Sequence, residues 1–289
     1  MVGVAFNEPQ RNVSEGSPRL RSGLCLAQSS GIYRERQTTG ALAATVKCLW
    51  THRLPRDETP HIAVVPDGCA DIIWSATGLA TVGPDRVAAF PALAAGETIF
   101  GARFRIGAAA SWLRTPLDAI TGQTLPLELF WGVAARDLDA RMTEARSASE
   151  RLTILAAALE ERLPAAPQLP SDIAVLRARL DEGRVPAADP VRTLARNTGI
   201  SERTLRRRCH EHFGYGAKTL DRILRLQRFL TACRAQPQGS LAMLALDAGY
   251  ADQAHLAREA KELTSLTPRQ IQTQLAINAK QDENISTTV

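Results

Sequence analysis

Three arginines, Arg203, Arg206 and Arg207, combine a chemically versatile side chain with helical spacing. A guanidinium group can donate two parallel hydrogen bonds to a guanine edge or to a phosphate. Residues three and four positions apart lie on one side of a helix, so these side chains would project together from its first two turns. Such a face suits the major groove of DNA, and the alternative is a basic helix surface that is only solvated.

A helix-turn-helix pattern over residues 189–213 predicts how these arginines are positioned. An Asp-Pro pair supplies the N-cap and the first position of an opening helix, and Gly199 makes the turn. Ser201 then caps a second helix, in which Leu205 and Cys209 are four residues apart and face inward. The second helix therefore carries the arginines away from its core contacts.

The same pattern occurs a second time over residues 240–264. Ser240 caps its first helix, a Gly-Tyr pair makes the turn, and Asp252 caps its second helix. From Leu194 the turn glycine is five residues on and the inward leucine eleven, whereas from Leu244 the glycine is again five on and the leucine twelve. Two unrelated helix pairs would have little reason to share these positions, so the repeat indicates two helix-turn-helix units.

Between the two units, Ala217–Cys233 contains neither proline nor glycine and predicts one long helix of roughly 25 Å. Its apolar stripe is expected to be core and consists of Leu220, Ile223, Leu224 and Leu230. Contact with phosphate and a solvated face are both open interpretations of its basic residues, Lys218, Arg222, Arg225 and Arg228.

The segments FGYGAKTLDRILRLQR and LALDAGYADQAHLARE resemble the DNA-binding domain of AraC-type transcriptional regulators, over the stretch from Asp189 to Gln270. In that family, two recognition helices enter successive major-groove segments on one side of bent DNA. The resemblance therefore implies double-stranded DNA, at an operator or promoter, as the main partner. It assigns the three arginines to the first recognition helix, and the matching positions of the second are Gln253, Ala254, Ala257 and Arg258.

The sequence departs from the family pattern at three positions. Arg208 and Cys209 stand where large apolar residues are usual, and Ser265 stands where glycine is often found. We therefore expect the core of the first unit to be less filled, at a local cost in stability.

Length and charge indicate two domains of different character. The chain has 289 residues, of which 45% are hydrophobic, and a formal net charge of +5. Residues 1–188 contain 20 basic and 20 acidic side chains, whereas residues 189–270 contain 14 basic and 8 acidic ones. The excess positive charge therefore lies in the repeat, where it favours an anionic polymer. With 3 tyrosines and 7 phenylalanines, the chain has too few aromatic side chains for a base-stacking RNA-binding protein.

The N-terminal part predicts strands followed by helices. The runs that predict strands, by apolar content or by alternation, are 42–50, 61–65, 71–74 and 100–106. Pro66-Asp67-Gly68 predicts a tight turn between paired strands. From Ala108 the pattern is helical, and the apolar face around Leu152–Leu159 is either a dimer face or intradomain core.

We expect an α+β protein, with a small β-sandwich or barrel-like domain, its following helices, and an all-α C-terminal domain. The predicted divisions are a disordered extension at 1–30, a regulatory or dimerisation domain at 31–163, a linker at 164–170 and the DNA-binding domain at 171–289.

The segments VVPDGCADIIW and GARFRIGAAASWL resemble an uncharacterised N-terminal domain that often precedes AraC-type DNA-binding regions. The resemblance does not identify a ligand. In regulators of this kind the N-terminal part commonly senses a small molecule or dimerises. A small-molecule effector, a second copy of the chain and RNA polymerase are therefore candidate partners.

The five cysteines do not predict disulfides or a zinc site, because their number is odd and no CxxC pair occurs. Cys69, with His61, Asp67 and Asp71 nearby, could be a metal site or redox sensor, but we favour a buried small residue beside a turn. An alkyl-transfer enzyme fused to the same DNA-binding fold should show clustered cysteines, and these are absent from the sequence. A nonspecific nucleic-acid packaging protein is disfavoured, because the basic charge is confined to the predicted recognition helices.

No apolar run is long enough for a membrane span, and the first 30 residues lack the apolar block of a secretion signal, which predicts a cytoplasmic protein. The sequence therefore predicts a bacterial, sequence-specific transcriptional regulator with no catalytic residues, no cofactor and no metal. The alternative is a DNA-binding domain fused to a cysteine-based alkyl-transfer or redox-sensing domain.

Overall fold

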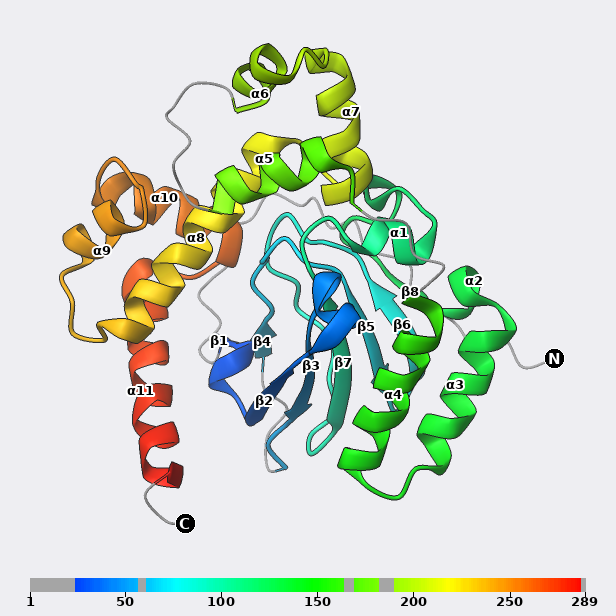
Figure 1. The fold of residues 1–289 in the computed structure, drawn as a ribbon. Coiled ribbons are helices and arrows are strands. Elements are labelled where there is room, and N and C mark those ends of the chain that lie inside the picture. Colours follow the sequence, from blue (N-terminus) through cyan, green and yellow to red (C-terminus); the bar gives the residue numbers. More distant parts are fainter. Residues whose placement is uncertain (1–23, 57–60, 164–168, 182–189, 287–289) are drawn as a thin grey trace, which may run out of the picture.

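The computed structural model describes residues 24–56, 61–163, 169–181 and 190–286 (Figure 1). Most of the predicted linker, 164–168, and the predicted extension up to residue 23 lie outside the described residues. The last part of that extension is folded, which corrects the prediction of disorder. Leu24–Leu26 form strand β1, and Ala27–Ser29 form a 3-10 helix, η1.

Long-range contacts explain why β1 is folded. It pairs in parallel with β4, His61–Ala63. The side chain of Gln274 accepts the N–H of Leu26 at 2.8 Å and donates to the carbonyl oxygen of Leu24 at 3.0 Å. Leu26 is 4% exposed and packs with the C-terminal helices. A local composition argument cannot detect a partner that lies so far along the chain.

Six strands in the described part of the chain form one antiparallel sheet, in the order β2-β3-β7-β5-β6-β8. In β7, the predicted alternation places Phe100, Ala102 and Phe104 in the core. Gly101 lies against the indole of Trp50, where any side chain would collide. The strands are β2 Ile32–Gln37, β3 Val46–Arg53, β5 Asp71–Ser75, β6 Gly78–Val82, β7 Thr98–Phe104 and β8 Thr124–Pro126.

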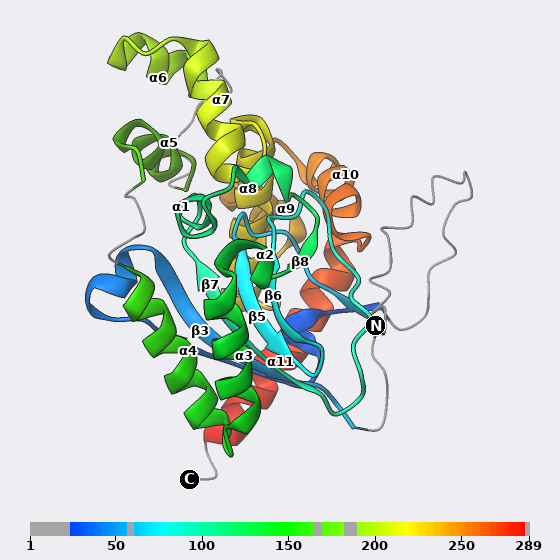
Figure 2. The same ribbon diagram turned by 90° about the vertical axis from the view of Figure 1, so that its right-hand side faces the viewer.

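Helices α3 (Val133–Glu144) and α4 (Ala148–Arg162) cover one face of this sheet (Figures 1 and 2). Ser147 caps α4 by accepting the N–H of Glu150. Leu155 and Leu159 are fully buried against the strands, so the apolar face of α4 is intradomain core. Short helices complete this half: η2 Gly40–Ala44, α1 Ala109–Leu113, η3 Leu117–Ala119 and α2 Glu128–Trp131.

The C-terminal half is helical and contains both predicted helix-turn-helix units, α6–α7 and α9–α10, joined by α8. In Figure 1, α8 runs between α6–α7 at the top and α9–α10 at the left. The predicted α+β class is confirmed. The bounds are α5 Ser171–Asp181, α6 Pro190–Thr198, α7 Glu202–Phe213, α8 Ala217–Ala235, α9 Leu241–Asp247, α10 Gln253–Thr264 and α11 Pro268–Ser286. None of the helices described has both the length and the apolar character to cross a membrane.

The turn at residues 66–68 does not join paired strands, which corrects the sequence prediction. β4 pairs with β1, whereas β5 pairs with β6 and β7. Asp67 still makes a local turn, because its carboxylate accepts the N–H of Cys69 at 2.9 Å. The segment leaves the sheet here to meet α8, where Gln227 donates to the carbonyl oxygen of Pro66 at 2.8 Å.

Candidate nucleic-acid interface

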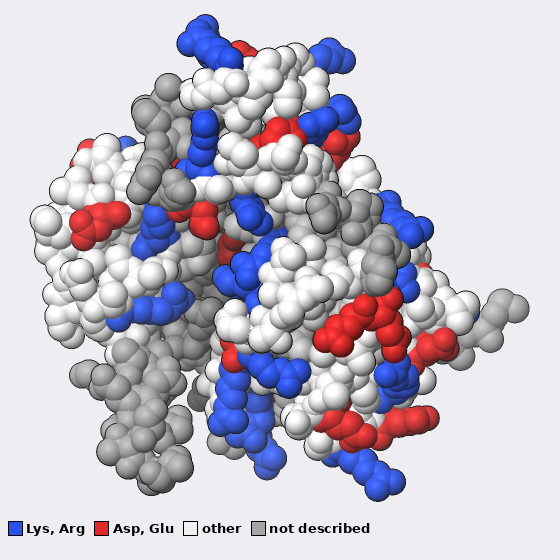
Figure 3. All heavy atoms as spheres, in the orientation of Figure 1, with Lys and Arg blue, Asp and Glu red and all other residues white. Residues whose placement is uncertain are grey.

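Helix α7 presents Arg203, Arg206 and Arg207 to solvent. Ser201 caps the helix, and its hydroxyl accepts the N–H of Thr204 at 3.2 Å. On the face drawn in Figure 3, basic side chains lie along the upper edge, where Figure 1 has α6 and α7. The inward side of α7 is fully buried through Leu205, Cys209 and Phe213.

Two of these arginines are paired with acidic neighbours on the same helix. Arg206 Nη2 lies 3.0 Å from Glu202 Oε2, and Arg207 pairs with Glu211. Both pairs are four residues apart and largely exposed, so each contributes less than about 1 kcal/mol. A phosphate or a guanine edge can therefore replace the glutamate at little cost.

The two family departures in α7 do not leave an empty core. Cys209 is fully buried, and α5 packs beside it through Ile173, Leu176 and Leu180. Arg208 does not enter this core, because its Nη1 lies 2.6 Å from Oδ2 of Asp172, whose side chain is 4% exposed. The expectation of a less filled first core is therefore wrong, since a helix outside the repeat supplies apolar surface.

Helix α10 presents smaller side chains than α7. Asp252 caps it by accepting the N–H of His255 at 2.6 Å. Small alanines allow close approach to a base pair and can contact the methyl group of thymine. The four predicted residues all lie on its exposed side: Gln253, Ala254, Ala257 and Arg258.

Two further polar residues share these exposed faces and were missed by the sequence argument. His210 is exposed three residues after Arg207, and Lys261 is exposed three residues after Arg258. Helical spacing alone could have identified both. Lys261 Nζ donates to the carbonyl oxygen of Ser265 at 2.6 Å, so it also satisfies a backbone group at the end of α10.

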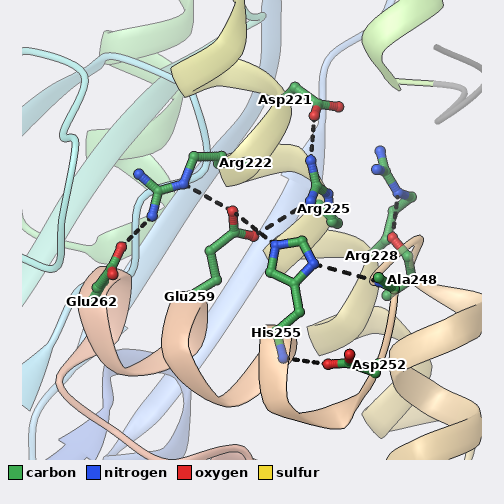
Figure 4. Close-up of polar contacts among 10 residues, drawn as sticks. Asp221, Arg222, Arg225, Arg228, Ala248, Asp252, His255, Glu259 and Glu262 are labelled. Carbon is green, nitrogen blue, oxygen red and sulfur yellow. Dashed lines mark hydrogen bonds and ion pairs between the residues drawn. The ribbon is translucent and has the colours of Figure 1, made fainter. Parts of the chain in front are cut away.

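Arg222, Arg225 and Arg228 do not form a purely solvated face, one of the two sequence interpretations, because all three bind groups of the protein (Figure 4). Arg222 Nε donates to Glu259 Oε1 at 2.9 Å. Arg225 Nη1 lies 3.9 Å from Glu259 Oε2. These arginines therefore attach α10 to α8, whereas Lys218 is exposed as a solvated face requires.

Arg228 connects the end of α9, in the second helix-turn-helix unit, to α5, the helix that precedes the first unit. Its Nε donates to the carbonyl oxygen of Ala248, which caps the C-terminus of α9, at 3.2 Å. Its Nη1 donates at 3.2 Å to the carbonyl oxygen of Leu180, near the C-terminus of α5. Carbonyl groups at helix ends lack intrahelical partners and carry partial negative charge. The Arg228 guanidinium therefore supplies a hydrogen-bond donor to a carbonyl group at the end of each of two helices.

Ser265, the third family departure, ends α10 in the left-handed region. Its φ is 62°, and its N–H donates to the carbonyl oxygen of Lys261 at 3.0 Å. This conformation costs a residue with a Cβ about 1–2 kcal/mol, which is why glycine is common at such positions. Ser265 therefore adopts the left-handed turn that glycine favours, and the strain is local.

Cys69 lies beside the Asp67 turn as expected, although it is half-buried and not fully buried. Burial raises the pKa of the Cys69 thiol well above its usual value, and the charge of Asp67 adds to this effect, so the thiol is a poor nucleophile at neutral pH. Nearby, Arg103 binds Asp71 through two hydrogen bonds, of 3.2 and 3.0 Å. Within the described ranges, no group of His, Cys, Asp and Glu side chains is arranged to hold a metal ion.

Two domain families match the chain. Residues 194–274 match a helix-turn-helix domain, which covers the second unit and all but the start of the first. Residues 34–126 match a domain of unknown function, DUF6597, which covers the antiparallel sheet. Comparison with curated proteins gave no match.

Solved structures of ToxT from Vibrio cholerae are similar to this chain at low identity. The apo form of a variant is 10% identical with a TM-score of 0.44, covering 83% of this chain and 100% of that chain. A second structure is 9% identical with a TM-score of 0.40, covering 78% and 97%. A form bound to an unsaturated fatty acid is 10% identical with a TM-score of 0.35, covering 78% and 94%.

The family matches and the helix geometry agree on the nature of the two halves. The helix-turn-helix match includes the capped second helix of each unit, α7 and α10, and the DUF6597 match ends in β8. Both resemblances noted in the sequence are thus confirmed. The chain carries an AraC-type helix-turn-helix domain behind an N-terminal domain of unknown function.

Proposed function

We propose that this chain is a transcriptional regulator that binds double-stranded DNA at specific sequences, with α7 and α10 in two adjacent major-groove segments. The observation that carries the proposal is the pair of helix-turn-helix units, each with a capped second helix whose exposed side bears polar or basic residues. The chemistry is recognition, without catalysis.

The two helices offer different readout. The arginines of α7, Arg203, Arg206 and Arg207, would contact guanine edges and phosphates. On α10, Gln253 suits adenine and Arg258 suits guanine, while Ala254 and Ala257 allow close approach. We therefore expect a first box that is rich in guanine and a second box of mixed composition.

The packing of α8 supports a fixed spacing between the two boxes. The helix has 19 residues and is about 28 Å long. Leu220 and Ile223 pack with the first unit, and Phe229 and Leu230 pack with the second. Because Arg228 also bonds to the end of α9 in the second unit and to α5, which packs on the first unit, α8 would hold the recognition helices about one DNA turn apart.

The N-terminal domain would modulate this binding through contacts with both recognition helices. Thr121 Oγ1 donates to the carbonyl oxygen of Gly214, the C-cap of α7, at 3.0 Å. The N–H of Ala88 donates to the carbonyl oxygen of Leu263 in α10 at 2.7 Å. A small-molecule effector or a second copy of the chain acting on the N-terminal domain could therefore alter both helices. RNA polymerase is the partner through which a bound regulator would act.

Selection from a randomised DNA library with the full chain tests the proposal. We expect enrichment of two short boxes whose centres are about one helical turn apart. Replacing Arg203, Arg206 and Arg207 together with alanine should abolish the enrichment. Arg141→Ala, which removes an exposed arginine on α3, is the matched control and should leave it unchanged. Selected sequences indistinguishable from the starting pool would contradict the proposal.

A further inference from the structure

A buried carboxylate stands on the inner side of the second recognition helix. Glu259 is 5% exposed, although the neighbouring inward residues of α10 are apolar. Its oxygens face α8, where Arg222 Nε donates to Oε1 at 2.9 Å and Arg225 Nη1 lies 3.9 Å from Oε2 (Figure 4). A buried charge costs free energy unless it is paired and hydrogen-bonded, so packing alone does not account for a glutamate here.

The two arginines that face Glu259 are themselves held from other directions. Arg222 Nη2 also pairs with Glu262 Oε2 at 2.5 Å, one turn further along α10. Arg225 donates to Asp221 at 2.5 Å, and its guanidinium lies 5.5 Å from the ring centre of Tyr250 in the helix-turn-helix turn. The guanidinium groups that face the Glu259 carboxylate are therefore held in place by contacts with other residues.

Apolar packing beneath α10 would not by itself determine its rotation. Leu256 and Leu263 pack against α8 residues such as Phe229, and such contacts attract without directional preference. A small rotation of α10 therefore costs little in these contacts, yet it displaces Gln253 and Arg258 relative to the base edges. A guanidinium–carboxylate hydrogen bond, by contrast, has a preferred distance and direction.

We propose that Glu259 is a positioning residue, whose bond to Arg222 sets the rotation of α10 on α8 and thereby the discrimination of the second DNA box. The inference rests on the proposed function, because it concerns the DNA contacts of α10. The first unit uses a separate pair, Arg208 with Asp172, to join α7 to α5. Loss of Glu259 is therefore expected to affect one box and not the other.

Three substitutions separate positioning from stability. Glu259→Leu keeps an inward side chain but removes the hydrogen-bond acceptor. Glu259→Gln keeps an oxygen that can accept from Arg222 Nε. Glu262→Gln changes only the exposed partner of Arg222 and is the control. The Arg222 side chain is 32% exposed and keeps Glu262, so Glu259→Leu does not leave a buried arginine without a partner.

The measurement is titration of each variant with the selected site and with sites that carry one substitution in either box. Wild type, Glu259→Gln and Glu262→Gln should each disfavour a second-box substitution by about tenfold or more. Glu259→Leu should disfavour it by less than about threefold, while first-box discrimination and the thermal midpoint are retained, because an apolar side chain replaces a buried charge.

Several outcomes would overturn the inference. They are unchanged second-box discrimination in Glu259→Leu, equal losses at both boxes, and a loss in Glu259→Gln as large as in Glu259→Leu. If Glu259→Leu does not fold, Arg222→Met removes the same bond from the α8 side and should give the same selective loss. A wild-type chain without preference for either box would overturn the proposed function as well, whereas normal wild-type preference with an unaffected variant overturns the inference alone.

Discussion

The guanidinium of Arg208 on α7 reaches the buried carboxylate of Asp172 in the first turn of α5, with Nη1 2.6 Å from Oδ2. The two residues are 36 positions apart. In the sequence, Arg208 is one of a basic run and Asp172 belongs to a short helix before the repeat. Their contact shows that α5 takes part in holding the first recognition helix.

Arg208→Met should therefore destabilise the first unit, because it leaves the Asp172 carboxylate buried without its partner. We expect the free energy of unfolding to fall by about 2 kcal/mol. Chemical denaturation followed by circular dichroism measures the change. In the double variant with Asp172→Leu most of the loss should be recovered, and two independent, additive losses would show that the pair is not coupled.

Substitution of the predicted base-reading arginines should weaken specific binding in both boxes. Arg207→Ala and Arg258→Ala should each cost about 1–3 kcal/mol on the selected site and relax preference at one base position in each box. Titration on that site and on scrambled DNA measures the effect. An equal loss on both DNAs would mean that these arginines contact only phosphate.

Spacing between the two boxes should matter as much as their sequence. Because α8 is rigid and packed on both units, an insertion of about half a DNA turn should place one box on the far side and reduce binding to near the nonspecific level. A full-turn insertion restores the side but exceeds the reach of α8, so it should also fail. Gel-shift affinities within a factor of a few of the parent site would contradict a rigid connector.

Ser265→Gly should stabilise the end of α10. The residue has a φ of 62°, which glycine adopts without a Cβ penalty, so we expect a gain of about 1 kcal/mol. Ser240→Gly is the control, because Ser240 caps α9 with a φ of −62° and has no strain to relieve. Thermal unfolding of both variants gives the comparison, and a lower midpoint for Ser265→Gly would show that its side chain contributes more than its backbone strain costs.

Asp85 should make stability depend on pH in the acidic range. Burial, aided by the negative charges of Asp67 and Asp71, raises the pKa of its carboxyl to about 6. A carboxyl with a raised pKa binds its proton more tightly in the folded state, so its contribution is full below about pH 4 and is lost as pH rises to about 6.

Asp85→Asn should remove this dependence and stabilise the protein at pH 7 by about 1 kcal/mol, a value reduced because the side chain is partly exposed. Denaturation midpoints between pH 4 and 7 test both statements. A variant whose midpoint follows the same pH curve as the wild type would assign the dependence to other groups.

The sequence by itself determined the helix-turn-helix repeat, because every feature of that repeat is local. Caps such as Ser201 and Asp252, the turn glycines and the inward leucines act within a few residues of one another, so helical periodicity predicts them directly. The alternation of Phe100, Ala102 and Phe104 is likewise local and predicted β7. The exposed positions of the residues predicted to contact DNA follow from the same periodicity.

Only the tertiary structure decided what the charged and terminal residues do. In the sequence, contact with phosphate and a solvated face are both open for Arg222, Arg225 and Arg228. In the fold, these side chains bond to groups of α10 and α5, which pack beside α8. Strand β1 is held by hydrogen bonds to Gln274, which lies far along the chain. Sequence periodicity does not identify the partner of a charged side chain. The partner depends on which distant helix packs beside it, and this is a property of the folded structure.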